Sequence, residues 1–283
     1  MVKMGSMLKN ALKDVFAKEE IEKVYSSFDI IGDIIIIKIP EELDGKKEII
    51  AKILINKIKT VKTVFQQISS VQGEYRTRRL CFLTGINKSI TEYREHGCIF
   101  KVDVLKTYFS PRLSTERLRV SKLIRNNEII VNMFAGIGTY SIILAKKNPD
   151  CIVYSIDSNP DATDLCIINS KLNKVQDRVI PILGNARTII ATQLKGKATR
   201  VLMPLPEQAA EFIDSAIMAL ENNKGIIHYF AHIKAKSKLN ALEEGKVNCH
   251  NHFQCYQYKI ICGRVIREVG PRIYQTVFDL EIL

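Results

Sequence analysis

Two glycines in the stretch VNMFAGIGTYSI, residues 131–142, could hold a nucleotide-like ligand. Gly136 and Gly138 follow a short apolar run, and glycine lets the backbone bend tightly and approach a ligand closely. A helix that begins beyond them would offer oriented backbone N–H groups. A dinucleotide site would need a third glycine three residues later, but Ser141 stands there. The pattern therefore favours a single nucleoside over a dinucleotide.

Polar residues end the next two apolar runs. Asp157 in YSIDSNP lies about 20 residues beyond the glycines, where a carboxylate can accept hydrogen bonds from both hydroxyls of a ribose. Gly184, Asn185 and Ala186 end the third run and are placed to meet an adenine edge. Each stretch alone could be ordinary turn chemistry. Three in chain order predict the cofactor cradle of an S-adenosylmethionine methyltransferase.

A further run, TRVLMPLPEQAAEFI at residues 199–213, is typical of a buried strand whose tip opens into an active site. Enzymes that modify a nucleobase nitrogen often carry an Asn followed by Pro at such a tip. Here Met203 is followed by Pro204. A proline has no side-chain donor and no backbone N–H, so it would offer an apolar wall and one carbonyl acceptor.

The elements that must position these residues are parallel strands. Five apolar strand candidates alternate with helix-length mixed segments, a pattern typical of a doubly wound α/β sheet. The candidates are EIIVNMFAG, CIVYSID, RVIPILGN, TRVLMPL and GIIHYFAHI. Two long strand-like segments follow at the end of the chain, YQYKIICGRVIREVG and RIYQTVFDLEIL, and predict a hairpin that closes the sheet edge. We expect a Rossmann-like methyltransferase domain over 111–283.

The first part of the chain predicts a small α/β domain over 1–110. Residues 7–25 have helical composition, and FDIIGDIIIIKIP reads as two strands broken at Gly32 and Asp33. Apolar residues then recur at intervals of three and four from Ile50 to Phe65, which predicts a helix with a solvated lysine face. Short alternating segments after Arg79 predict strands.

The charge and the cysteine content limit the possible functions. The net charge of +12 favours a polyanionic partner such as RNA, although a solvated cationic surface is the bland alternative. Seven cysteines without a CxxC pair indicate reduced thiols and no disulfide framework. The first residues are not expected to form a signal peptide, and no apolar run approaches the roughly 20 residues needed to span a bilayer. We expect a soluble, cytoplasmic monomer without a membrane partner.

One group of residues could bind a metal ion. CHNHFQC, residues 249–255, contains two cysteines and two histidines. If this stretch were a strand, its cysteines and histidines would point to opposite faces, so we expect no metal site. His228, in the fifth apolar run, is expected to be a buried or pocket-lining residue and not a catalyst.

The junction EHGCIFKVDVLKTYFSPRLSTERLRVSKLI, residues 95–124, resembles a known family. The chain is similar to the archaeal and eukaryotic tRNA (guanine-37)-N1 methyltransferases and their wyosine-pathway relatives over nearly all of residues 70–283. The resemblance rests on the motifs YREHG, DVLKTYFSPRLSTER, NMFAGIG, IDSNP and FDLEI. An amino-terminal domain of many members is expected to be absent.

The resemblance implies roles for particular residues. Methylation of guanine N1 needs a base for the N1 proton and a cation for charge on O6. Glu116 matches the family's base, Arg76 matches its arginine, and Tyr108 lies in the block that borders the methionine end of the cofactor. Glu116 could otherwise be a surface capping residue. The residues expected to bind S-adenosylmethionine are Arg117, Asn132, Phe134, Ala135, Gly136, Gly138, Asp157, Ser158, Asn185, Ala186 and Pro204.

Three departures keep alternatives open. Asn132 and Asn185 stand where relatives commonly have Asp, and Pro204 stands where they have Asn. The pattern is similar to the archaeal subgroup that methylates N1 of guanosine 37 and then a carbon of the tricyclic wyosine precursor. One alternative is transfer of the 3-amino-3-carboxypropyl group from the same cofactor. Another is an RNA-binding adaptor that has lost catalysis.

Overall fold

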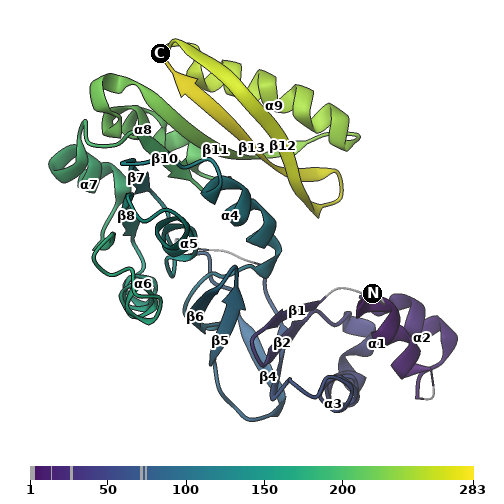
Figure 1. Ribbon diagram of the computed structural model, residues 1–283. Coiled ribbons are helices and arrows are strands. Elements are labelled where there is room, and N and C mark those ends of the chain that lie inside the picture. The colour runs from purple at the N-terminus through teal and green to yellow at the C-terminus, as the bar shows by residue number, and fades with distance from the viewer. Residues whose placement is uncertain (1–3, 14, 26–27, 71–72, 74) are drawn as a thin grey trace. The chain divides into compact units, whose positions relative to one another are not determined.

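The computed structural model describes residues 4–13, 15–25, 28–70, 73 and 75–283. The chain divides into two compact units, unit 1 (Met1–Arg112) and unit 2 (Leu113–Leu283), whose elements are labelled in Figure 1. The sequence analysis sets the corresponding boundary at residue 110.

Unit 1 is built on a four-stranded sheet of order β1-β2-β3-β4, accompanied by a β5–β6 hairpin. Only β2 and β3 run parallel in this sheet, and helix α3 connects them. The side chains of α1, α3 and the inner strands share one apolar core. The elements are α1 (Met4–Leu12), α2 (Lys18–Lys23), β1 (Phe28–Ile31), β2 (Ile34–Ile37), η1 (Glu41–Lys46), α3 (Lys47–Lys57), β3 (Thr63–Gln67), β4 (Leu80–Gly85), β5 (Ile90–Glu95) and β6 (Cys98–Asp103).

One expected helix is too long. The helix predicted from Ile50 to Phe65 ends at Lys57, and Phe65 belongs to strand β3. A turn closed by the Val61 N–H on the Ile58 carbonyl separates the two elements. Pairing of β3 with strands on both sides outweighs the apolar spacing of this segment, because the sheet satisfies its backbone groups.

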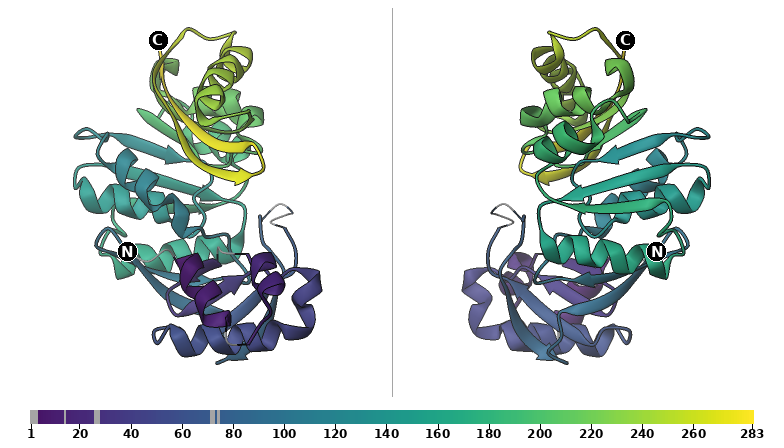
Figure 2. Two further views of the ribbon diagram at one scale, coloured as in Figure 1. Left: turned by 90° about the vertical axis from the view of Figure 1, so that its right-hand side faces the viewer. Right: turned by 90° about the vertical axis from the view of Figure 1, so that its left-hand side faces the viewer.

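Unit 2 contains a seven-stranded sheet of order β12-β13-β11-β10-β7-β8-β9. Strands β7 to β11 are parallel, as the sequence predicts, and the carboxyl-terminal hairpin inserts β13 beside β11 (Figure 2). The α/β, Rossmann-like class is confirmed. The elements are η2 (Pro111–Leu113), α4 (Ser114–Ser121), β7 (Ile129–Asn132), α5 (Thr139–Lys147), β8 (Ile152–Asp157), α6 (Pro160–Leu172), β9 (Val179–Leu183), α7 (Ala186–Ile189), η3 (Ile190–Leu194), β10 (Arg200–Met203), η4 (Ala209–Phe212), α8 (Ile213–Ala219), η5 (Glu221–Asn223), β11 (Gly225–Lys234), α9 (Lys238–Phe253), β12 (Tyr258–Gly270) and β13 (Ile273–Ile282).

Alternation along the strands separates the two faces of this sheet. Val131, Val201 and Ile227 are buried against α7, α8 and α9 in the main apolar core. Their neighbours Asn132 and His228 point to the opposite face, where α4 and α5 lie. Polar side chains are therefore buried on the α4–α5 face, and the apolar core fills the other.

The CHNHFQC stretch corrects a second expectation. Residues 238–253 form helix α9, so Cys249, His250 and His252 lie on a helix and not on a strand. Buried positions recur every four residues along it, at Ala241, Gly245, Cys249 and Phe253, and pack on the sheet. Among the residues that the structure describes, no cluster could hold a metal ion, and no helix is long and apolar enough to cross a membrane.

Candidate active site

The glycine loop joins the ends of β7 and β8. The Ala135 N–H donates to the Ile156 carbonyl at 2.8 Å, and the Gly136 N–H donates to Asp157 Oδ2 at 2.6 Å. Gly138 adopts the left-handed conformation, with φ of 85°, just before α5 begins. The loop therefore turns back over the strand ends and presents its backbone there.

Asp157 organises the neighbouring turn. Its carboxylate also accepts the Asn159 N–H at 3.0 Å, and its carbonyl accepts the Gly184 N–H at 2.9 Å. Burial raises the pKa of Asp157 above its ordinary value, although these N–H bonds act in the opposite direction. Ser158 follows it and is half-buried. Three successive strand ends are thus tied together by hydrogen bonds to the side chain and the backbone of one residue, Asp157.

Asn185 and Ala186 begin the short helix α7 after β9. The Asn185 side-chain oxygen accepts the Arg187 N–H at 2.9 Å, so it already caps this helix. Asn185 is exposed and Ala186 is buried. A contact between Asn185 and an adenine edge would use the second lone pair of the oxygen or the amide nitrogen.

Asn132 carries a buried polar atom that the protein does not satisfy. Its side chain lies at the end of β7, is 1% exposed, and donates from Nδ2 to Ser141 Oγ at 3.1 Å. Its Oδ1 is buried and has no hydrogen-bond partner. Buried oxygens nearly always have a partner, so this atom fits a ligand that brings a donor such as an amino group.

Phe134 and Pro204 border the same strand ends. The Met133 N–H donates to the Leu202 carbonyl at 3.0 Å, which keeps the tips of β7 and β10 adjacent. Phe134 packs edge-on against Phe212, with ring centroids 5.0 Å apart. Pro204 is half-buried directly after β10. These residues supply apolar surface and no side-chain hydrogen-bond donor.

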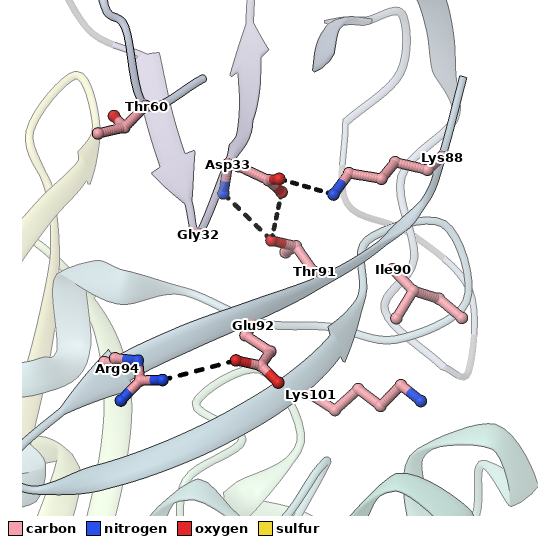
Figure 3. Close-up of a pocket in the computed structure, with 9 residues that line it drawn as sticks. All are labelled: Gly32, Asp33, Thr60, Lys88, Ile90, Thr91, Glu92, Arg94 and Lys101. Carbon is pink, nitrogen blue, oxygen red and sulfur yellow. Dashed lines mark hydrogen bonds and ion pairs between the residues drawn. The ribbon is translucent and has the colours of Figure 1, made fainter. Parts of the chain in front are cut away.

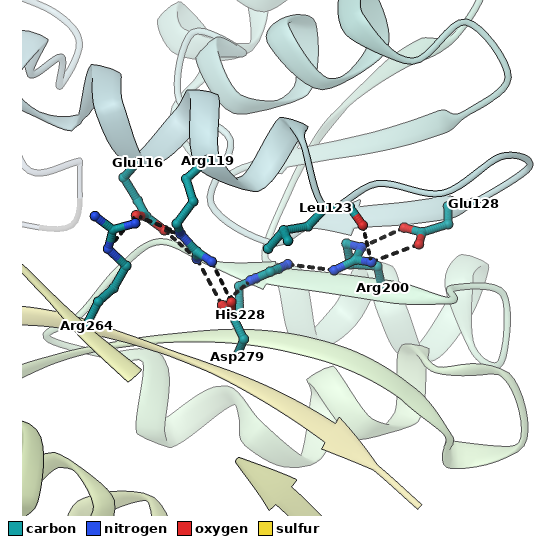
Figure 4. Close-up of polar contacts among 8 residues, drawn as sticks. All are labelled: Glu116, Arg119, Leu123, Glu128, Arg200, His228, Arg264 and Asp279. Carbon is teal, nitrogen blue, oxygen red and sulfur yellow. Dashed lines mark hydrogen bonds and ion pairs between the residues drawn. The ribbon is translucent and has the colours of Figure 1, made fainter. Parts of the chain in front are cut away.

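Glu116 is buried in the first turn of α4, with 2% of its side chain exposed. Arg119, three residues on, donates to both oxygens of this carboxylate at 2.7 to 3.0 Å, as Figure 4 shows. Arg264 on β12 lies 3.6 Å from Glu116 Oε2. Arg117, between the two, is buried as well. Glu116 is therefore not a surface capping residue.

A chain of buried ionic groups continues from Arg119 across the sheet (Figure 4). Arg119 also donates to both oxygens of Asp279 on β13, at 2.5 and 3.0 Å. His228, directly opposite on β11, contacts Asp279 Oδ1 through Nδ1 at 2.6 Å. On its far side, Nε2 lies 2.8 Å from Arg200, which in turn donates to both oxygens of Glu128.

The tautomer of His228 follows from its neighbours. An arginine can only donate, so Nε2 of His228 must accept and Nδ1 must carry the proton that goes to Asp279. Burial lowers the pKa of His228, which keeps the ring neutral. Burial raises the pKa of Asp279, but hydrogen bonds from His228 and Arg119 outweigh it and hold this pKa well below its usual range. The expectation that His228 is buried is confirmed.

Arg76 and Tyr108 lie together in unit 1. The Arg76 guanidinium carbon is 5.7 Å from the centre of the Tyr108 ring, a cation–π distance. Arg76 has φ of 54°, an uncommon conformation for a residue with a side chain. The segment before it includes residues outside the described part of the chain.

The structure therefore groups the predicted residues in two sets. Those of unit 2 gather at the strand ends and on α4, and those of unit 1 form the Arg76–Tyr108 pair. Sequence reasoning missed Arg119 and Asp279. The only available signals were the three-residue spacing from Glu116 to Arg119 and a charged residue inside the apolar run VFDLEIL.

A separate pocket of 470 Å³ in unit 1 does not involve the predicted residues (Figure 3). Two ion pairs lie in its lining, Lys88 with Asp33 at 2.6 Å and Arg94 with Glu92 at 3.7 Å. The remaining lining residues are Gly32, Thr60, Ile90, Thr91 and Lys101.

Comparison with known proteins gives matches along most of the chain. The TRM5/TYW2 methyltransferase domain matches residues 91–255, and the TYW2 N-terminal domain matches residues 8–88. The tRNA (guanine(37)-N(1))-methyltransferase Trm5b of Pyrococcus abyssi is 41% identical over 91% of this chain and 75% of its own length. The tRNA 4-demethylwyosine(37)-methyltransferase Taw21 of Saccharolobus solfataricus is 34% identical over 92% of this chain and 95% of its own.

Solved structures show the same similarity. A complex of aTrm5 with tRNALeu superposes with a TM-score of 0.84 at 34% identity, covering 98% of this chain and 78% of the other. Methanocaldococcus jannaschii TYW2 in complex with AdoMet gives a TM-score of 0.66 at 28% identity, covering 90% and 99%. From the strand-end loops, the matched domain and these relatives, it follows that the chain belongs to the TRM5/TYW2 methyltransferase family.

Proposed function

We propose that this protein transfers a methyl group from S-adenosylmethionine to base 37 of tRNA, at N1 of guanosine. The observation that carries the proposal is the burial of the Glu116 carboxylate on α4. This helix packs beside α5, which begins directly after the glycine loop. A carboxylate held out of water in such a place suits proton abstraction. The named activity of the Trm5b relative supports the same reaction.

The strand ends of unit 2 suit this cofactor. The glycine loop would let the cofactor approach the backbone closely, and the remaining lone pairs of the Asp157 carboxylate would accept from its ribose hydroxyls. Asn132 Oδ1 would accept from an amino group of the cofactor. When bound, S-adenosylmethionine supplies an electrophilic methyl group. Arg117, Phe134, Ala135, Ser158, Ala186 and Pro204 would complete the cofactor-binding set.

The protein's own groups would handle the proton and the charge. Glu116 would accept the N1 proton of guanosine, so the nucleobase would not have to lose this proton to water before it reacts. Arg76 stabilises the negative charge that builds on O6, and its stacking on Tyr108 restricts the guanidinium to few orientations. Glu116 must loosen its bonds to Arg119 to do this, because oxygen lone pairs that accept from the guanidinium cannot take up a proton at the same time.

A second methylation, on a carbon of the tricyclic wyosine precursor, is part of the proposal. Pro204 supports it, because an apolar wall can accept a bulkier base than an Asn built to bond a guanine edge. The Taw21 relative is named for this substrate. Transfer of the 3-amino-3-carboxypropyl group is the alternative that the mass of the product distinguishes.

Glu116→Gln tests the base. Single-turnover methyl transfer to tRNA should fall on the order of 100- to 10,000-fold, because the amide keeps the size of the side chain and one acceptor oxygen for Arg119 but takes up no proton. Binding of S-adenosylmethionine, measured by calorimetry, should stay near that of the wild type. Glu281→Gln, two residues from Asp279 on β13, is the matched control and should keep full activity.

Mass spectrometry of the nucleosides identifies the reaction. A methyl group on guanosine 37 is the expected product. An aminocarboxypropyl product, or tRNA left unmodified by a protein that binds it, would replace the proposal by one of the two alternatives. A rate for Glu116→Gln within a few-fold of the wild type would remove Glu116 as the base.

A further inference from the structure

Arg119 is shared by two buried carboxylates. It uses Nε and one terminal nitrogen for Glu116, and both terminal nitrogens for Asp279. Burial lowers the pKa of Arg119, but its bonds to Asp279 and Glu116 outweigh this and raise the pKa above its usual value. Arg119 is thus permanently charged and always needs a counter-ion.

Uptake of a proton by Glu116 removes one of the two counter-ions. If Arg119 had only Glu116, protonation would leave a largely buried guanidinium without a charged partner, which costs several kcal/mol. Asp279 remains ionised and keeps Arg119 paired at 2.5 and 3.0 Å. The second carboxylate therefore allows Glu116 to become neutral without leaving Arg119 unpaired in this buried site.

Asp279 is itself held in place by a second set of buried residues. The Nδ1–H of His228 donates to it, and the tautomer that allows this is fixed because Nε2 accepts from Arg200. Arg200 is in turn paired with Glu128 and donates to the Leu123 carbonyl after α4. Each neighbour fixes the next, so the position of Asp279 does not depend on whether Glu116 is charged.

We propose that Asp279, oriented by His228 and Arg200, is a positioning residue for methyl transfer: it holds Arg119 so that Glu116 can accept the proton of the target base. This inference rests on the proposed role of Glu116. The charged groups facing Glu116 are Arg119 on its own helix and Arg264 on β12. Those facing Asp279 are Arg119 and His228, with the exposed Cys262 opposite on β12.

The test is the pH profile of single-turnover methyl transfer by the full chain, with wild type and Asp279→Asn. Removing the second carboxylate leaves Glu116 as the counter-ion of Arg119, so transfer of a proton to Glu116 would leave a largely buried guanidinium without a charged partner. The acidic limb of the profile should move down by about one pH unit. The plateau rate should fall about threefold to tenfold.

Controls separate this role from a structural one. Glu281→Gln should leave both the limb and the plateau unchanged, and S-adenosylmethionine should bind Asp279→Asn as it binds the wild type. If Asp279→Asn does not fold, Asp279→Thr supplies a second neutral residue, β-branched and suited to a strand. An acidic limb at the wild-type position in the folded neutral variant would overturn the inference.

Failure of the proposed function would look different. If Glu116→Gln kept the wild-type rate, the base would be elsewhere, and both the function of Glu116 and the positioning role would be refuted. If Glu116→Gln were inactive and the neutral Asp279 variant kept the wild-type profile and rate, only the positioning role would be refuted.

Discussion

At the scale of single residues, Pro204 follows the tip of strand β10, where the family resemblance implies an Asn. It stands half-buried after β10, beside the tip of β7. We expect Pro204→Asn to narrow the enzyme toward N1 of guanosine, because buried amide groups would go unsatisfied against a base that cannot pair with them. The measurement is methyl transfer by wild type and variant to two tRNAs, one with guanosine 37 and one with the demethylated wyosine precursor.

The ratio of the two rates decides this prediction. Equal losses on both tRNAs would mean that Pro204 only holds the backbone. A wild type that is inactive on the tricyclic base would refute the dual-substrate proposal itself.

Gly138 is a second residue whose type the geometry requires. Its φ is +85°, and an added Cβ would lie 2.5 Å from the Cys166 sulfur. Gly138→Ala should therefore lower the free energy of unfolding by more than the roughly 1–2 kcal/mol of left-handed strain, and should weaken S-adenosylmethionine binding. Gly196→Ala is the control, since Gly196 has φ of +68° and open space around its Cβ position. Equal effects of the two variants in denaturant unfolding would contradict the predicted clash.

At the scale of elements, the β11–β13 pair makes stability depend on pH. His228 is neutral and wholly buried in the folded protein, and burial lowers its pKa. In the unfolded chain the same histidine titrates at about pH 6.5. The unfolded state therefore binds more protons below that pH. The free energy of unfolding should therefore fall as the pH falls from 7 to 5. Asp279, whose pKa is depressed, adds a further loss as the pH falls below about 4.

Variants isolate the histidine contribution. His228→Gln, which can donate to Asp279 and accept from Arg200, should flatten the pH 5–7 part of the curve measured by urea unfolding. His250→Gln, at an exposed position of α9, should leave it unchanged. The same slope in all three proteins would assign the pH dependence to other groups.

At the scale of the whole molecule, the net charge of +12 predicts how tRNA binds. Each phosphate neutralised by Lys or Arg releases counter-ions, so log affinity should fall with log salt by about 0.9 per phosphate. Filter binding or fluorescence titration across a salt series measures this slope. S-adenosylmethionine binding over the same series is the control and should change little. A slope near zero for tRNA would remove RNA as the partner.

The meeting of the glycine loop with Asp157 at one edge of the sheet could be predicted because its signals are local. Gly136 and Gly138 follow an apolar run, and Asp157 ends the next, so parallel strands alone bring them to one edge of the sheet. The α/β class follows from the same alternation of apolar runs and helix-length segments. The roles of Glu116 and Arg76 were predicted from the resemblance to a family and not from residue spacing.

Two elements show where local patterns fail. The apolar spacing that runs on to Phe65 is broken at Lys57, because β3 gains sheet partners on both sides. The CHNHFQC stretch shows no strand or helix period over seven residues. Over sixteen residues, the four-residue spacing of buried positions in α9 makes the helix plain.

By itself, the sequence determined the order of strands and helices, the glycine loop and the excess of positive charge. Only the tertiary structure decided which buried charges meet. Arg119 and Asp279 are 160 residues apart and come together because β13 inserts beside β11 under α4. A salt bridge between such distant positions leaves no periodic trace, since its free energy depends on burial and geometry that exist only once the sheet has formed.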